Sequence, residues 1–168
     1  LVANGESLLT ANDASNQGYS RASGTSFAAP STTGSLALAL QYHTNSVSAT
    51  PMYSATLRGL AIHTAKEAGN ALGPDYKHGW GLYNAVACVE LSDANQASST
   101  GVAYIKESRL PNGEAISFPV VAKGGEPLKV TIVWTDPPYY DMEGNTLNDA
   151  LDPEDVMLVN DLDLRVRA

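Results

Sequence analysis

The spacing of apolar residues changes along the chain and divides it into a helical first part and an alternating second part. Residues 31–40 are small or aliphatic on nearly every helical face, which is typical of a buried helix. We expect this helix to run from Thr25 to about His43. Short strands are expected before it, at 7–10 and at 19–23, separated by a segment rich in turn-forming residues.

Two further helices are predicted in the first part. The pair Thr50-Pro51 is typical of a helix start, and Gly69 would follow the end of that helix. Asn84 would cap a short helix that reaches about Leu91.

The segment between these helices contains Trp80 with a glycine on each side. This pattern predicts a buried indole beside backbone of unusual dihedral angles.

Beyond residue 91 the pattern becomes polar and then alternates. Residues 92–101 are small and polar and are predicted to be a linker. Apolar residues then recur at every second position in short runs between glycine and proline turns. Such runs predict an antiparallel β-sandwich over residues 102–168, with strands at 102–107, 115–121, 128–134 and in a last run that ends at Val166.

Composition and charge exclude several classes of partner. The chain has 168 residues, of which 43% are hydrophobic, and a net charge of −8. A core can therefore be buried, whereas nucleic acid and anionic membrane surfaces are disfavoured as partners. The sequence contains no run of 18 apolar residues, and therefore no membrane span is predicted. The single cysteine, Cys88, excludes an internal disulfide and is interpreted as a small buried residue.

The stretch Gly24-Thr25-Ser26-Phe27-Ala28-Ala29-Pro30 carries the candidate chemistry. A serine that enters a helix directly after a glycine turn lies near unpaired backbone N–H groups and the positive end of the helix dipole. These groups stabilise an oxyanion, as a nucleophilic serine requires. The alternative is an ordinary serine at a helix N-cap. The stretch resembles the motif around the catalytic serine of subtilisin-like serine proteases (subtilases), with Phe27 where methionine is usual.

The resemblance extends through Gly79-Trp80-Gly81 and Asn84-Ala85, and so covers about residues 1–91. It implies an α/β fold, with residues 1–91 forming the C-terminal segment of a mainly parallel sheet with helices. It also implies peptide hydrolysis through Ser26, with Gly24 and Thr25 in the nucleophile loop. Residues 127–137 and 158–164 resemble a jelly-roll domain that follows some bacterial subtilase domains. Secretion or a cell-surface location would follow from the same resemblance.

Most of a subtilase active site is missing from this sequence, because the family's aspartate and histidine precede the serine. We expect the chain to begin inside a larger protein, since it lacks an initiating methionine and signal-peptide features. His43 would lie roughly 25 Å along the helix from Ser26 at 1.5 Å per residue. His63 and His78 are interpreted as structural.

The chain alone is therefore predicted to be inactive as a peptidase. We expect it to need either the missing N-terminal part of the catalytic domain or self-association, with a protein or peptide as substrate. Two alternatives stay open: a pseudoprotease, and a β-sandwich that serves as a binding or adhesion module.

An acidic stretch near the C-terminus is the remaining candidate site. Nine acidic residues and no lysine or arginine lie from Asp136 to Asp163. Carboxylate oxygens are ligands that calcium prefers, so a structural calcium ion is one hypothesis. A solvated acidic loop is the alternative, and no cofactor is required for the chemistry itself. The candidate ligands are Asp136, Asp161 and Asp163, with Asp149, Asp152 and Asp155 in the same stretch.

Overall fold

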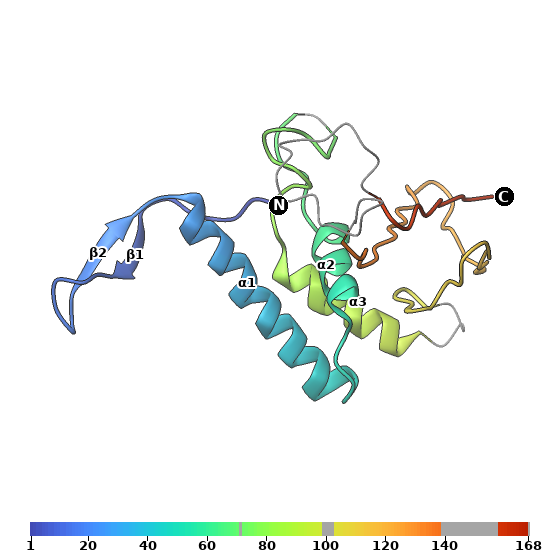
Figure 1. Cartoon of the computed structure of the whole chain (residues 1–168), viewed down its shortest axis with the longest axis horizontal. Helices are drawn as coiled ribbons and strands as arrows, with labels where there is room; N and C mark the ends of the chain where they lie inside the picture. Colours follow the sequence, from blue (N-terminus) through green and yellow to red (C-terminus); the bar gives the residue numbers. More distant parts are fainter. Residues whose placement is uncertain (71, 99–102, 139–157, 168) are drawn as a thin grey trace, which may run out of the picture.

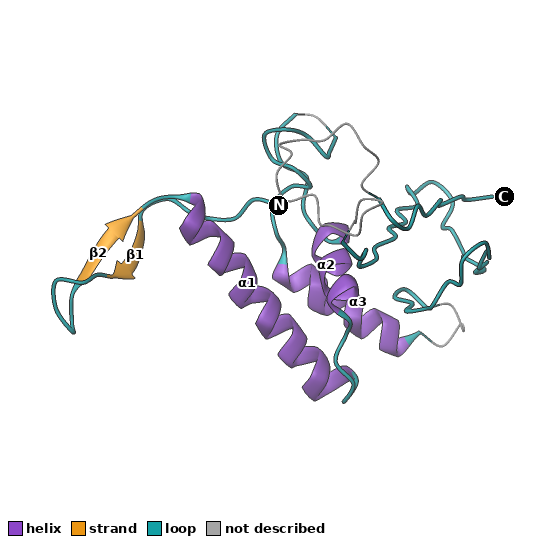
Figure 2. Cartoon of the chain, in the orientation of Figure 1, coloured by secondary structure: helices purple, strands orange, loops and turns teal. Residues whose placement is uncertain are grey.

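In the computed structural model, the described part of the chain consists of a hairpin, three α-helices, a short π-helix and long irregular segments (Figure 1). The structure describes residues 1–70, 72–98, 103–138 and 158–167. Figure 2 shows that, among the described residues, regular secondary structure is confined to the part of the chain before residue 98. The three helices lie side by side, and the hairpin projects beyond the N-terminal end of the first helix (Figure 1).

The hairpin consists of β1 (Leu8–Ala11) and β2 (Tyr19–Ala22). The strands pair antiparallel, with Leu8 opposite Ala22 and Ala11 opposite Tyr19. Both predicted strands are confirmed to within one residue. The mainly parallel sheet is not seen in the described residues, where one isolated parallel bridge joins Val2 to Leu82.

Helix α1 (Thr25–Tyr42) matches the predicted helix almost residue for residue. The expectation that it is buried is wrong for this chain, because Ala39 is its one buried residue and Leu38 is 67% exposed. Among the described helices, α2 and α3 lie along one side of α1, and the side that includes Leu38 is left open (Figure 1).

A five-residue π-helix (His43–Val47) continues α1, and α2 follows at Ser54–His63. The predicted start at Thr50-Pro51 is wrong, since Tyr53 is the N-cap residue and its own side chain makes no cap hydrogen bond. Glu107 fills part of that role, because its carboxylate accepts the Tyr53 N–H, one of the four unpaired donors at the helix start, and the Thr56 hydroxyl. A distant carboxylate can thus satisfy a helix start that lacks a local cap.

Helix α3 (Ala85–Ala97) begins at the predicted cap, where the Asn84 Oδ1 atom accepts the Ala87 N–H at 3.1 Å. It is six residues longer than expected and includes residues 92–97, which were predicted as linker. Asn, Asp and Ser lower helix propensity only slightly, so the packed face of α3 outweighs them. The small core lies between the helices and contains Ala39, Leu60 and the fully buried Cys88, as expected for the cysteine.

The segment between α2 and α3 folds back on the N-terminus. The Val2 N–H donates to the Gly81 carbonyl at 2.9 Å, and Lys66 pairs with Leu82 in both directions. Gly79 and Gly81 have φ angles of 57° and 101°, which confirms the predicted unusual backbone. Trp80, however, is 48% exposed, so the expected burial of the indole is wrong. Gly69 has φ 91° but lies six residues beyond the end of α2, and therefore does not cap it.

The predicted β-sandwich is not seen in the described residues after 102, where no strand is formed. Alternation predicts which residues share a face, but a strand also requires a hydrogen-bonded neighbour. The segment 128–134 instead lies against α2, where the Lys129 ammonium donates to the His63 carbonyl and the Arg58 guanidinium donates to the Trp134 carbonyl. The domain division at residues 91 and 102 stays a prediction.

Candidate functional site

Gly24 places the candidate nucleophile, because it joins the end of β2 to the start of α1. Its φ of 156° and ψ of 162° lie in a region that L-residues with a side chain rarely adopt. Ser26 is the second residue of α1, directly after this turn. A glycine is therefore needed at position 24 for the chain to enter the helix in this direction.

The first turn of α1 leaves backbone donors open beside Ser26. The N–H groups of Phe27 and Ala28 donate to the Gly24 carbonyl, at 3.1 and 3.3 Å. Those of Thr25 and Ser26 come earlier in the helix and have no intrahelical acceptor. Pro30 lies inside α1 and has no N–H, so the Ser26 carbonyl also lacks its helical partner. The Ser26 side chain is exposed, and its hydroxyl makes no hydrogen bond to a residue that the structure describes.

Residues 5–7 form a short segment, here called the strap, that holds this turn from outside. The Gly24 N–H donates to the Gly5 carbonyl at 2.8 Å, and the Ser7 N–H donates to the Ser23 hydroxyl at 2.8 Å. Arg21 donates to the Ser7 carbonyl at 2.6 Å. A Cβ atom on Gly5 would lie 2.6 Å from the Gly24 carbonyl oxygen, so the approach of the two segments needs glycine.

Sequence reasoning missed the strap, although the dipeptide Asn4-Gly5 is typical of a turn. Neither Ser7 nor Arg21 belongs to a motif, and an arginine bond to a main-chain carbonyl has no spacing rule. Gly5 was the one available signal, since glycine is favoured where two backbones approach closely.

None of the three histidines is hydrogen-bonded to Ser26. His43 follows the last residue of α1, at the opposite end of that helix from Ser26 (Figure 1). The His63 Nδ1 atom lies 2.9 Å from the Thr131 hydroxyl, and burial followed by the nearby Lys129 charge lowers the pKa of His63. These positions agree with the prediction that neither residue serves as the base for Ser26.

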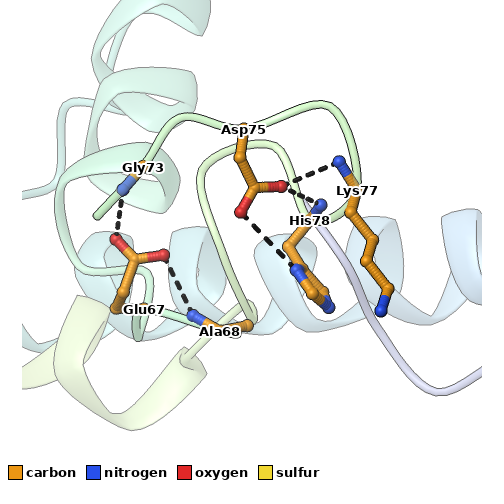
Figure 3. Close-up of polar contacts among 6 residues, drawn as sticks. All are labelled: Glu67, Ala68, Gly73, Asp75, Lys77 and His78. Atoms are coloured by element: carbon orange, nitrogen blue, oxygen red, sulfur yellow. Dashed lines mark hydrogen bonds and ion pairs between the residues drawn. The ribbon is translucent and has the colours of Figure 1, made fainter. Parts of the chain in front are cut away.

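The third histidine, His78, belongs to a turn that Asp75 organises (Figure 3). One carboxylate oxygen of Asp75 accepts the N–H groups of Lys77 at 2.8 Å and His78 at 2.6 Å, while the other lies 3.6 Å from the His78 Nδ1 atom. The two backbone donors, from His78 first, lower the pKa of Asp75. Glu67 binds the Gly73 N–H at 2.7 Å in the same loop. These contacts fold the loop and leave its carboxylates engaged.

Two of the three leading calcium candidates, Asp136 and Asp163, are engaged elsewhere, while Asp161 is exposed. Asp136 accepts hydrogen bonds from the backbone N–H groups of Val159 and Asn160, at 2.8 and 3.0 Å. Burial opposes ionisation of Asp136, but these donors outweigh it and lower the pKa. Asp163 pairs with Arg165 at 3.0 Å. No cluster of three acidic, histidine or cysteine residues able to hold a metal ion occurs in the part of the chain that the structure describes. Asp149, Asp152 and Asp155 lie outside the described residues, so calcium stays a prediction.

Two surface hollows lie away from the serine. One, of about 390 Å³, is apolar and is lined by residues of α1, α2 and the Trp80 loop. The other, of about 350 Å³, lies beside the π-helix and is lined by His43, Asn95 and Glu107 among others. Ser26 lines neither hollow, so these residues do not form a substrate cleft around it.

An exposed serine in the first turn of a helix, beside open backbone N–H groups, is an arrangement that serine hydrolases use for a nucleophile. Residues 1–81 match the sequence profile of the Subtilase family, Peptidase_S8. This part of the chain is thus similar to serine peptidases. No curated protein and no solved structure matched the chain. In the parts of the chain that are described, no helix is long and apolar enough to cross a membrane.

Proposed function

We propose that this chain supplies the nucleophile of a subtilisin-like serine endopeptidase, with Ser26 as the catalytic residue. The observation that carries the proposal is the position of Ser26. It is exposed at the start of α1, directly after the Gly24 turn, in a stretch within the Subtilase profile match. The substrate is a protein or peptide.

The chemistry assigns separate roles to groups inside and outside this chain. The Ser26 oxygen attacks the scissile carbonyl carbon, and the open Ser26 N–H donates to the oxyanion that forms. A histidine accepts the serine proton and then gives it to the leaving amine, while an aspartate orients that histidine. Water then hydrolyses the acyl-enzyme. Because His43, His63 and His78 all lie elsewhere, we assign the histidine and aspartate to another stretch of polypeptide.

The open side of α1 supports a need for that second polypeptide. Leu38 is largely exposed there, although an apolar helix is normally covered. The second polypeptide is either an N-terminal part of the same catalytic domain or another copy of the chain. The chain alone is accordingly inactive.

The test is covalent labelling by a fluorophosphonate, which reacts with activated serines. The gene is expressed with an upstream extension of about one catalytic domain, and the labelled peptide is mapped. Labelling at Ser26 that is lost in Ser26→Ala, but kept in Ser35→Ala, supports the proposal. Ser35 is a matched control because it lies in the same helix and its hydroxyl only donates to the Ser31 carbonyl.

A folded assembly that is not labelled would contradict the proposal and favour the pseudoprotease. The binding or adhesion alternative depends on exposed aromatic residues, and its pair Tyr139-Tyr140 lies outside the described residues. Tyr104 and Phe118 are exposed in the described part of residues 102–168, but single exposed aromatic residues are ordinary on a protein surface and do not favour this alternative.

A secreted or cell-surface location and a structural calcium ion complete the proposal. Both follow from the likeness to subtilases, and calcium is additionally supported by the acidic stretch. Isothermal titration with calcium tests the ion: heat uptake or release together with a raised melting temperature supports it, and the absence of both removes it.

A further inference from the structure

Ser7 is the starting point, because its backbone conformation is unusual. Among the residues that the structure describes, it is the only non-glycine residue with a positive φ, at 54°. This left-handed conformation is unfavourable for residues with a Cβ atom, and serine lacks the side-chain preference that helps Asn and Asp adopt it. Such residues persist where the surrounding contacts determine them, and they concentrate at functional sites.

The bend at Ser7 shifts the register between the two sides of the hairpin. The regular pairing of Leu8 with Ala22 would continue as Ser7 with Ser23, and then as Glu6 with Gly24. Ser7 does face Ser23, but through the serine hydroxyl. The next backbone bond joins the Gly24 N–H to Gly5, one residue further along. The offset resembles a β-bulge, a feature that redirects side chains beside active sites.

Two side chains hold the bend from opposite ends. The Ser23 hydroxyl accepts the Ser7 N–H, and the Arg21 guanidinium donates to the Ser7 carbonyl at 2.6 Å, with a second contact to the Ser7 hydroxyl at 3.4 Å. Arg21 lies on β2, opposite Leu9, so the paired strands fix its position. Its charged donor strengthens the hydrogen bond beyond a neutral one.

The strap in turn contacts the turn that carries Ser26. Gly5 approaches both the Gly24 carbonyl and Ala28, whose Cβ would lie 3.0 Å from a Cβ on Gly5. That same carbonyl accepts the first two hydrogen bonds of α1. A change in the bend at Ser7 therefore reaches Gly24 and the first turn of the helix through direct contacts.

We infer that Arg21 is a positioning residue for Ser26: it holds the left-handed bend at Ser7, and the offset strap then fixes the Gly24 turn. The inference rests on the proposed function of Ser26. Arg21 touches neither substrate nor the reacting atoms, so its loss should slow the reaction of Ser26 without changing substrate affinity.

The first experiment compares Arg21→Ala with Arg58→Ala in the assembled protein, that is, in this chain together with the second polypeptide that supplies the histidine and aspartate. Arg58 is the matched control, because it also is exposed and donates to a main-chain carbonyl, that of Trp134 at 3.1 Å, but on α2. We expect Arg21→Ala to lower the fluorophosphonate labelling rate at Ser26, and kcat for a peptide, at least tenfold at unchanged KM. Arg58→Ala should leave both within twofold of wild type, and Arg21→Lys should recover part of the loss.

Rescue at Ser7 separates positioning from a general loss of stability. Glycine adopts a positive φ without the steric cost, so Ser7→Gly in the Arg21→Ala background should recover much of the labelling rate. Wild-type labelling in Arg21→Ala would overturn the inference while leaving the proposed function intact. A failure of the double variant to recover labelling would also count against it.

Hydrogen exchange tests the inference even if wild type is never labelled. In the full chain, Arg21→Ala should speed exchange of the Gly24 and Ser7 amides at least fivefold, with Cys88 in the core unchanged. If the fluorophosphonate does not label the wild-type protein, only the proposed function of Ser26 is refuted. If hydrogen exchange at the Gly24 amide is unchanged in Arg21→Ala, the positioning role of Arg21 is refuted.

Discussion

Gly34 allows a direct test of whether one side of α1 is open in this chain. It lies in the middle of the helix, and a Cβ atom added to it would meet no atom within 4 Å apart from the adjacent backbone of its own helix. Replacing an interior helical glycine by alanine gains about 0.5–1 kcal/mol, because the unfolded chain loses conformational freedom. We therefore expect Gly34→Ala to stabilise the isolated chain by that amount.

Gly59 provides the matched control, because it lies within α2 but in a crowded position. A Cβ atom there would lie 2.9 Å from the Val133 Cγ2 atom, which belongs to the segment packed against α2. The same helical gain is thus offset by a required shift of Val133, since forcing extra volume into a packed contact typically costs about 1–3 kcal/mol. Gly59→Ala should be neutral or destabilising.

Urea denaturation followed by circular dichroism at pH 7 measures both variants, with thermal melting as a second probe. A gain of 1 kcal/mol corresponds to a rise in Tm of roughly 2–4 °C for a chain of this size. Destabilisation by Gly34→Ala in the isolated chain would refute the open face of α1. Equal stabilisation by the two variants would refute the packing of residues 128–134 on α2. In the assembled protein, Gly34→Ala should instead weaken association if the second polypeptide covers this side.

Three further substitutions test the cap, the core and the titrating histidine. Asn84→Ala removes the acceptor for the Ala87 N–H and should cost about 1 kcal/mol in urea denaturation; a value near zero would contradict the cap. Leu60→Ala empties a site that is 5% exposed, so we expect a loss of roughly 2–5 kcal/mol by the same method, whereas an unchanged midpoint would contradict the core. Burial lowers the pKa of His63, so the unfolded state binds the proton first. The unfolding free energy should therefore fall as pH decreases below about 6.5, and His63→Gln should flatten that slope; an unchanged slope in this variant would contradict the lowered pKa.

Local signals in the sequence predicted the elements that depend on neighbours along the chain. The hairpin, α1 and the Asn84 cap were all placed within about one residue, because turn residues, helix propensity and caps act over a few positions. The start of α2 was placed three residues early. Its cap comes from Glu107, which lies 54 residues from Tyr53 and cannot be foreseen from local sequence.

Burial and strand pairing were less predictable, because both depend on what lies opposite. The apolar pattern correctly predicted that residues 25–42 form a helix. Its burial was not predicted correctly, because α2 and α3 cover only part of the helix surface. Residues 115–121 and 128–134 alternate as strands do, yet Val120 and Val121 are about half exposed or more and no described segment pairs with them. The alternating pattern thus shows that these segments could form strands, but a strand forms only where a second segment pairs with it.

The site shows the same division between local and distant information. Gly24, Thr25 and Ser26 could be found from the motif, whereas Ser7 and Arg21 could not. Yet Ser7, Arg21 and Gly24 belong to one hydrogen-bonded unit, and Thr25 and Ser26 follow Gly24 directly in the chain. Every contact of this unit lies within residues 5–28, so its formation requires only the hairpin and the first turn of α1.

Because all these contacts are local in sequence, the active site can form in two separate steps. The turn around Ser26 can be shaped before any second polypeptide arrives, whereas the general base cannot be supplied without it. If so, the Gly24 amide should be equally protected from hydrogen exchange in the isolated chain and in the assembly, while labelling of Ser26 should appear only in the assembly. If the Gly24 amide is protected only in the assembly, the second polypeptide shapes the turn. The contacts of the strap would then form as a consequence of assembly and would not position Ser26 beforehand.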